Sequence, residues 1–157
     1  MPGLMSEAAA VETREEERDG MRTIRLRIPA RAEYIALARL ALTGLAELTP
    51  MADETLADLK LALTEAVSNS IRHAYGSTGG NVEIAYELTA SELGVEVVDD
   101  GAGFDPERPP ALEGEELTEG GLGIAIIREI ADALEIQSEP GSRGSRLRFV
   151  KRLGASP

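Results

Sequence analysis

The sequence predicts an α+β fold, a two-layer sandwich in which a mostly antiparallel, mixed sheet carries helices on one face. The order of the elements is the first reason. A strand, two helices, two strands, a loop, a helix and two strands lack the regular alternation of a doubly wound parallel sheet. Size is the second reason, because 157 residues with 43% hydrophobic side chains suit one core and one domain.

The N-terminal residues 1–20 are expected to form a mobile tail ahead of a domain spanning residues 21–153. This segment is rich in Glu and Ala and shows no clear apolar face, so it offers little surface to bury. A short helix is the alternative interpretation. From Arg22 to Pro29 apolar residues alternate with arginines, which predicts a half-buried strand that ends at the proline.

Two helices follow this strand on either side of Pro50. Apolar residues recur at spacings of three and four from Tyr34 to Leu45, and a second helix starting near Met51 continues to Tyr75. Both spacings are typical of helices with one buried face. Glycines after Tyr75 end the second helix.

The rest of the chain alternates strand and helix signals around one long loop. Period-two patterns predict strands at 82–88 and 93–98, joined as a hairpin, and at 135–138 and 146–151. A largely buried helix is expected at 123–134. The loop between these elements is rich in Gly, Pro and Glu, with too few apolar residues to pack as a regular element.

Composition narrows the functional classes. Asp and Glu outnumber Lys and Arg by 28 to 16, giving a net charge of -12, which disfavours direct binding to nucleic acid or anionic membranes. No cysteine and one histidine are present, so disulfides, thiolate metal sites and multi-histidine centres are excluded. With no apolar run of transmembrane length and no export signal, a cytoplasmic location is expected.

The second helix carries a polar stripe. Glu65, Asn69 and His73 recur every four residues, so they line one side of the helix away from its apolar arc. A solvated face is the simplest interpretation. As a site, Asn69 offers a neutral oxygen to Mg²⁺, and Glu65 offers a carboxylate that accepts a proton from an attacking hydroxyl. His73 is more typical of a structural or rim residue.

Two glycine-rich segments give the stripe a context. Asp99 follows a strand and precedes Gly101 and Gly103, a combination that brings backbone close to a flat ligand while the carboxylate accepts a hydrogen bond from an exocyclic amine, as adenine presents. An ordinary Asp/Gly turn is the alternative.

The second segment, with Gly121 and Gly123, opens a helix whose free amides suit a phosphate. A hinge before a buried helix is the alternative there. Ser145 adds a hydroxyl within reach of a phosphate, although turn serines usually cap their own backbone.

Four segments in this order and spacing, TEAVSNSIRHAY, VVDDGAGFDP, TEGGLGIAIIREIAD and GSRGSRLRF, resemble the N, G1 and G2 boxes and the final turn of the Bergerat-fold (GHKL) ATPases. Within that superfamily the chain is similar to the anti-sigma factor serine kinases of the RsbW and SpoIIAB type. The resemblance extends from about Arg22 to Lys151 and leaves out the tail.

The resemblance implies a role for each site residue. Glu65 would be the general base, Asn69 the Mg²⁺ ligand and Asp99 the adenine contact. Gly101 and Gly103 would form the adenine-side loop, while Gly121 and Gly123 would close on the phosphates with Ser145 nearby. Leu122 and His73 complete the set of residues expected to line the nucleotide.

The family implies two alternative functions. In the first, the chain is a Mg-ATP-dependent serine/threonine kinase that phosphorylates an anti-anti-sigma (STAS) protein and sequesters an RNA polymerase sigma factor, as a homodimer. In the second, it is a nucleotide-gated binding module without phosphoryl transfer. Intact Glu65 and Asn69 favour the kinase, because a binding module has no need of a base.

Overall fold

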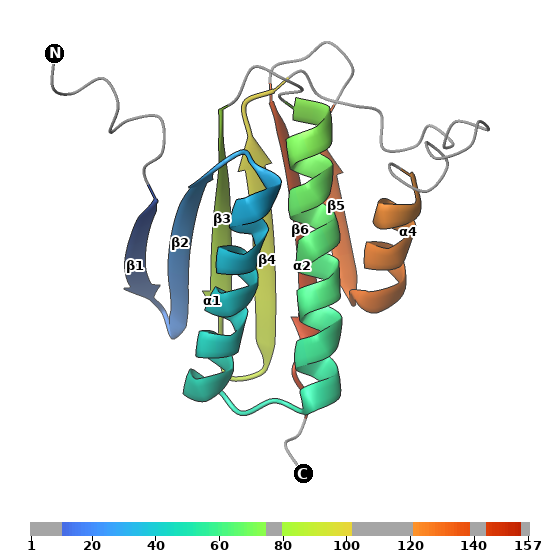
Figure 1. Ribbon diagram of the computed structural model, residues 1–157. Helices are drawn as coiled ribbons and strands as arrows, with labels where there is room; N and C mark the ends of the chain where they lie inside the picture. Colours follow the sequence, from blue (N-terminus) through green and yellow to red (C-terminus); the bar gives the residue numbers. More distant parts are fainter. Residues whose placement is uncertain (1–10, 75–79, 102–120, 139–143, 155–157) are drawn as a thin grey trace, which may run out of the picture.

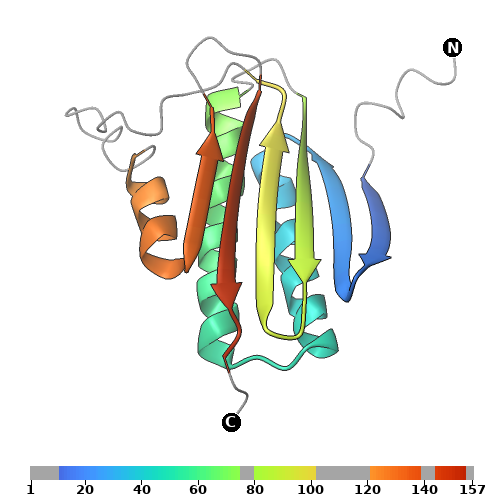
Figure 2. The same cartoon turned by 180° about the vertical axis from the view of Figure 1, so that it is seen from behind.

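The computed structural model describes residues 11–74, 80–101, 121–138 and 144–154. These residues form one six-stranded sheet in the order β1-β2-β3-β4-β6-β5, in which every neighbouring pair is antiparallel. The strands are β1 (Glu12–Arg18), β2 (Met21–Pro29), β3 (Asn81–Leu88), β4 (Glu92–Asp99), β5 (Ala133–Gln137) and β6 (Ser145–Arg152). Figure 2 shows the sheet from the side that carries no helix. The predicted α+β class is confirmed, with antiparallel pairing throughout the described strands in place of a mixed sheet.

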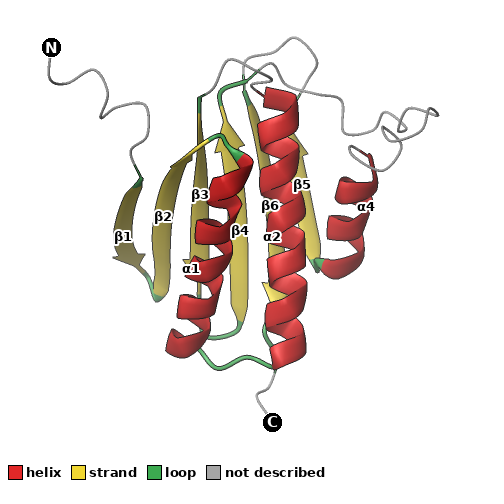
Figure 3. Cartoon of the chain, in the orientation of Figure 1, coloured by secondary structure: helices red, strands yellow, loops and turns green. Residues whose placement is uncertain are grey.

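The helices cover the other face of the sheet (Figures 1 and 3). They are α1 (Ile35–Leu48), preceded by a short 3₁₀ turn, η1 (Ala32–Tyr34), then α2 (Asp53–Ala74) and α4 (Gly121–Ile130). The long helix α2 lies between α1 and α4 and contacts both of them. None of the helices in the described residues has the length and apolar character needed to cross a membrane.

The core fills the space between these two layers. Alternate strand residues and one face of each helix supply fully buried side chains, among them Ile28, Leu42, Leu63, Ile84, Val95, Ile127 and Phe149. Tyr86 is also fully buried, and its hydroxyl donates to the carbonyl oxygen of Ala38 at 2.7 Å. Burial raises the pKa of Tyr86 above its ordinary value, so the ring stays neutral and ties β3 to α1.

The first correction concerns the N-terminal segment. Residues 12–18, expected within a mobile tail, form β1 and pair along their whole length with β2. All seven side chains of β1 are exposed, so no apolar alternation marks the strand. The turn to β2 is formed by Asp19 and Gly20, whose φ angles of 52° and 79° are both positive. Such a two-residue Asp-Gly turn is the preferred connection of a tight hairpin.

The second correction concerns the end of α4, which was expected at residue 134. The last helical bond runs from the Ala131 amide to the Ile127 carbonyl oxygen at 2.9 Å, and the Asp132 amide then donates to the Val150 carbonyl oxygen in β6. Leu134 packs on the core from β5 instead of from a helix. Its apolar side chain continues the helical pattern, which is why the periodicity did not reveal the break.

Charged side chains lie across the face of the sheet that carries no helix, which we call the uncovered face. Arg148 on β6 reaches over Gly94 to Glu87 on β3, with its Nη2 atom 2.6 Å from a carboxylate oxygen. A Cβ atom at Gly94 would lie 3.1 Å from both charged groups. Thr23 and Ala85 are buried on this face although no helix lies above them. Long charged side chains that lie flat on a sheet account for such burial.

Candidate active site

The residues predicted to bind nucleotide gather where α2 passes the end of β4 and the start of β6. Asp99 is the last residue of β4, and its cross-strand partner Ser145 is the first residue of β6. Asn69 and Ser70 lie on the buried face of α2. Segments far apart in the sequence therefore meet at one corner of the sandwich.

Three donors in the described part of the chain hold the carboxylate of Asp99, which is only 6% exposed. Its Oδ1 atom accepts from the Gly101 amide at 2.9 Å, and its Oδ2 atom accepts from the Ser145 hydroxyl at 2.5 Å and from the Ser70 hydroxyl. Buried carboxylates require such partners. A carboxylate oxygen accepts more than one hydrogen bond, so this group is both fixed in place and able to receive a further donor.

Ser70 is a site residue that sequence reasoning missed, because it falls among the apolar residues of α2. The structure does bury it, at 4% exposed. A hydroxyl on a core-facing arc requires a hydrogen-bond partner, and that requirement was the available signal. The partner is Asp99, 29 residues further along the chain.

Asn69 is buried, at 3% exposed, and its side-chain Oδ1 atom has no hydrogen-bond partner among the residues that the structure describes. An unsatisfied buried oxygen costs about 1–3 kcal/mol, so a native structure keeps one only where something compensates. A neutral amide oxygen is a ligand that Mg²⁺ accepts. The amide oxygen at this position therefore fits the Mg²⁺ ion that was predicted from the sequence.

Glu65 lies one helical turn before Asn69 and is partly exposed. Its carboxylate faces the first turn of α4, where a Cβ atom at Gly123 would lie 2.8 Å from Glu65 Oε2. A side chain at position 123 would have to displace this carboxylate, which is the end of a flexible side chain. The amides in the first turn of a helix lack internal partners, so the start of α4 brings unused donors beside Glu65.

The glycine before β6 holds the loop that follows Asp99. Gly144 has a φ of +86°, and a Cβ atom there would lie 2.7 Å from the backbone oxygen of Asp99. Its amide donates to the Gly101 carbonyl oxygen at 2.5 Å. The start of β6 thus holds the loop that follows Asp99, at a position where a larger residue would be strained.

Two of the predicted positions are described only in part or not at all. Gly103 lies outside the described residues, as does the side chain of His73. Leu122 is 47% exposed at the start of α4. Glu65, Asn69, Asp99, Gly101, Gly123 and Ser145 are brought to the same corner, and Gly121 begins α4. The corner combines a fixed carboxylate, a buried amide oxygen, a second carboxylate and the start of a helix, groups that can hold an amine, a cation and phosphates.

Comparison with known proteins gives matches over most of the chain. Residues 28–151 match the family described as the histidine kinase-like ATPase domain. The serine-protein kinase RsbW of Bacillus cereus is 32% identical over 137 residues, covering 82% of this chain and 86% of that protein. RsbW of Staphylococcus aureus is 32% identical over 139 residues, covering 82% of this chain and 87% of that protein.

Solved structures share the fold. The RsbU and RsbW domains of a Mycobacterium tuberculosis protein superpose with a TM-score of 0.59 at 19% identity, over 82% of this chain and 32% of that one. The histidine kinase domain of a blue-light activated histidine kinase from Erythrobacter litoralis gives a TM-score of 0.51 at 22% identity, over 80% of this chain and 62% of that one. This chain spans less than two thirds of the length of either structure.

Proposed function

The chain belongs to the histidine kinase-like ATPase family and, within it, to the RsbW-type serine-protein kinases, and from this premise we propose that it phosphorylates an anti-anti-sigma protein and sequesters a sigma factor. It is an ATP-dependent kinase of the anti-sigma type. We also propose a role for each site residue and the class of protein that it acts on. The observation that carries the assignment is the buried Oδ1 atom of Asn69, which has no hydrogen-bond partner among the described residues and lies one helical turn from Glu65.

Asp99 is proposed to recognise the adenine of ATP. Its carboxylate accepts hydrogen bonds but donates none when ionised, so it suits the exocyclic amine of adenine and opposes the carbonyl oxygen that guanine presents at the same position. The hydroxyls of Ser70 and Ser145 hold it in that orientation. Gly101 and Gly144 keep the adjoining backbone close.

Asn69 is proposed to be the protein ligand for Mg²⁺. Bound Mg²⁺ would supply positive charge that offsets the negative charge of the phosphates. The Oδ1 atom would then gain the partner that it lacks among the described residues. Ligands from water and phosphate would complete the octahedron that this ion prefers.

Glu65 is proposed to be the general base. Its carboxylate accepts the proton of a serine or threonine hydroxyl on the protein substrate while that oxygen forms a bond to the γ-phosphorus, and the bond to ADP breaks. Gly123 leaves room for the carboxylate beside α4. The amides at the start of α4, including those of Gly121 and Leu122, would donate to the phosphates.

The partners follow from the family. We propose that the chain acts in the cytoplasm as a homodimer that binds an RNA polymerase sigma factor and is opposed by an anti-anti-sigma protein of the STAS type, with no direct contact to nucleic acid. The names of the RsbW relatives support a serine-protein substrate. The net charge of -12 is compatible with a basic protein surface as partner.

Transfer of labelled phosphate from ATP to a cognate anti-anti-sigma protein tests the proposal. The Glu65→Gln variant keeps the shape of the side chain but removes the proton acceptor, so phosphorylation should fall by roughly two to four decades while ATP still binds. Glu54→Gln, an exposed acid in the first turn of the same helix, is the matched control and should transfer phosphate at the parent rate. Parent activity in Glu65→Gln would remove the base assignment. ATP binding without any transfer by the parent chain would instead support the nucleotide-gated binding module.

A further inference from the structure

Strand β1 lies at one end of the sheet, and the described part of the chain places nothing on its outer edge (Figure 1). It also lies outside residues 28–151, which match the ATPase family. An unprotected edge of this kind is a template for pairing with another strand.

The hairpin geometry shows which backbone groups of β1 point outward. Arg18 and Met21 flank the two-residue turn and pair across it, and the residues flanking such a turn exchange both hydrogen bonds. Bonded and unbonded pairs then alternate along an antiparallel ladder. The amides and carbonyls of Thr13, Glu15 and Glu17 consequently face away from β2, at the free edge.

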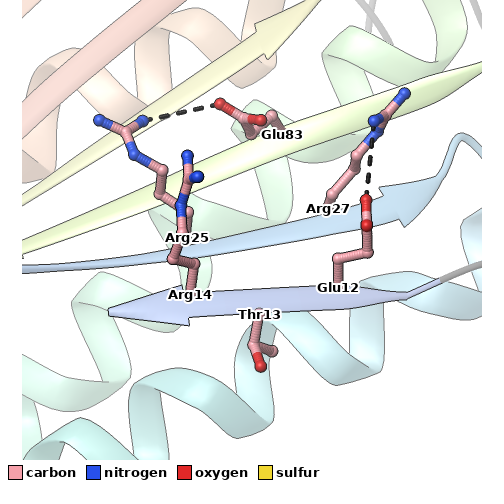
Figure 4. Close-up of a pocket in the computed structure, with 6 residues that line it drawn as sticks. All are labelled: Glu12, Thr13, Arg14, Arg25, Arg27 and Glu83. Atoms are coloured by element: carbon pink, nitrogen blue, oxygen red, sulfur yellow. Dashed lines mark ion pairs between the residues drawn. The ribbon is translucent and has the colours of Figure 1, made fainter. Parts of the chain in front are cut away.

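The side chains of β1 on the uncovered face alternate in charge. Figure 4 shows Glu12 and Arg14 on the same side of the sheet as Arg25, Arg27 and Glu83, with Thr13 pointing to the other side. Glu16 and Arg18 continue the row, because every second strand residue shares a face. The order along this face is thus acid, base, acid, base: Glu12, Arg14, Glu16 and Arg18.

We propose that two copies of this chain associate through antiparallel pairing of their β1 edges, centred on Glu15, so that the sheet continues from one copy into the other. In this register Thr13 of one copy lies opposite Glu17 of the second, and Glu15 lies opposite its own counterpart. All of these residues direct their backbone groups outward, so the free donors and acceptors meet one another.

The charges select the same register. Pairing about Glu15 sets Arg14 opposite Glu16 of the second copy. It also sets Glu12 opposite Arg18, and twofold symmetry repeats both contacts. A shift of two residues would set like charges against each other, either Arg14 against Arg14 or Glu16 against Glu16. Charges on an edge strand usually prevent pairing, but this order of signs prevents only the shifted registers. The one like pair is Glu15 with Glu15 at the axis, on the helix side of the sheet.

This inference names a surface for the homodimer proposed above and rests on that part of the proposed function, but not on phosphoryl transfer. A contact along one short strand buries less than the roughly 1,200 Å² of stable protein complexes. The association is consequently reversible and depends on concentration. Its signature is a pattern of neighbouring residues rather than a tight complex.

Cysteine cross-linking of the full chain reads that pattern directly, because the protein contains no cysteine. Opposed residues of a hydrogen-bonded pair have Cα atoms about 5.5 Å apart, within the range of about 4.4–6.8 Å for disulfides. Under oxidation with diamide, Glu15→Cys should cross-link to itself. Thr13→Cys and Glu17→Cys should not cross-link alone, because each lies about four residues from its own counterpart, or roughly 13 Å. A mixture of these two variants should cross-link, because Thr13 of one copy lies opposite Glu17 of the other.

Charge reversal provides the second arm, in the Glu15→Cys background. Arg14→Glu should reduce cross-linking several-fold, and adding Glu16→Arg to it should restore the yield, because the opposite charges then face each other again. Glu135→Arg, on the edge strand at the other side of the sheet, is the matched control and should change nothing.

Two results would overturn the proposal. One is the failure of Glu15→Cys to cross-link, and the other is equal self-linking of all three single-cysteine variants, which indicates random collision. If sedimentation shows a dimer but Glu15→Cys fails to cross-link, the copies associate through another surface, and the homodimer survives while the β1 contact does not. Kinase activity, measured on the same samples, stays unaffected by either outcome.

Discussion

At the scale of single residues, the site depends on one carboxylate with three donors. Asp99 accepts from Ser70, Ser145 and the Gly101 amide, and these donors come from α2, β6 and the adjoining loop. Each hydrogen bond restricts the side chain a little more. The result is an acceptor whose direction is set before any nucleotide arrives, so that binding does not have to order it.

Removing this carboxylate should weaken nucleotide binding. The loss of one charge-assisted hydrogen bond costs about 1.5–3 kcal/mol, so Asp99→Ala should lower ATP affinity by about one to two decades. Calorimetry with ATP and GTP measures the effect, and the parent chain should bind GTP poorly. Asp100→Ala, which removes the neighbouring carboxylate, should leave affinity near the parent value. Equal affinities for ATP and GTP in the parent would contradict the assignment.

Asn69 should show opposite effects on stability and on binding. Its buried Oδ1 atom has no partner within the described part of the chain, and an apolar residue of similar shape removes the cost of an unsatisfied oxygen, about 1–3 kcal/mol. Asn69→Leu should therefore be at least as stable as the parent in denaturant unfolding without nucleotide. It should also lose the Mg²⁺-dependent part of ATP affinity. A large loss of stability in the nucleotide-free variant would show that the amide has a structural role.

At the scale of elements, the packing of α2 against α4 determines how the carboxylate of Glu65, the proposed base, is oriented. Gly123 brings the first turn of α4 against Glu65, so a methyl group there has to displace the carboxylate. Gly123→Ala should lower the rate of phosphoryl transfer more than it lowers ATP affinity. Separate measurement of kcat and of ATP binding tests this. Gly44→Ala in α1, where a Cβ atom meets nothing within 4 Å, should preserve both quantities.

The elements could be predicted from the sequence where burial imposes a period, and not elsewhere. The strands β3 and β4 and the helices α1 and α2 each carry an apolar pattern, and all were found. Strand β1 lacks one because both of its faces are exposed. Asp19 and Gly20 were the missed signal, since this dipeptide marks a two-residue hairpin turn. The end of α4 was missed because an apolar residue at position 134 suits both a longer helix and the strand β5 that the structure shows.

The candidate site, like the secondary structure, could be predicted from the sequence only in part. Spacing along one helix predicted that Glu65 and Asn69 share a side, because that relation is local. The pairing of Ser70 with Asp99 depends on how α2 lies against β4, which no local pattern encodes. The nearness of Gly123 to Glu65 likewise depends on the packing of α2 against α4. Local geometry could thus be predicted, whereas contacts between elements required the fold.

At the scale of the whole molecule, the core and the N-terminal strand are separable. β1 contributes no buried side chain, and its ion pairs with β2, such as Arg27 with Glu12 at 3.6 Å, are exposed. Exposed pairs contribute about 0.2–1 kcal/mol each. A chain starting at residue 20 should therefore unfold cooperatively in denaturant, with a small loss against the 5–15 kcal/mol typical of domains. Its ATP affinity should match that of the full chain. Failure of this shortened chain to fold would show that β1 protects the edge of β2.

The three donors of Asp99 also determine when the site appears during folding. Ser70 and Ser145 lie 29 and 46 residues away from Asp99 in the sequence, and contacts across such separations form only after the chain has closed long loops. A refolding molecule should thus gain helix and strand signals before it gains affinity for ATP. Stopped-flow circular dichroism followed alongside a fluorescent ATP analogue should show nucleotide binding as the later phase. Newly made chains would then remain unable to bind the nucleotide until the last strand, β6, has joined the sheet.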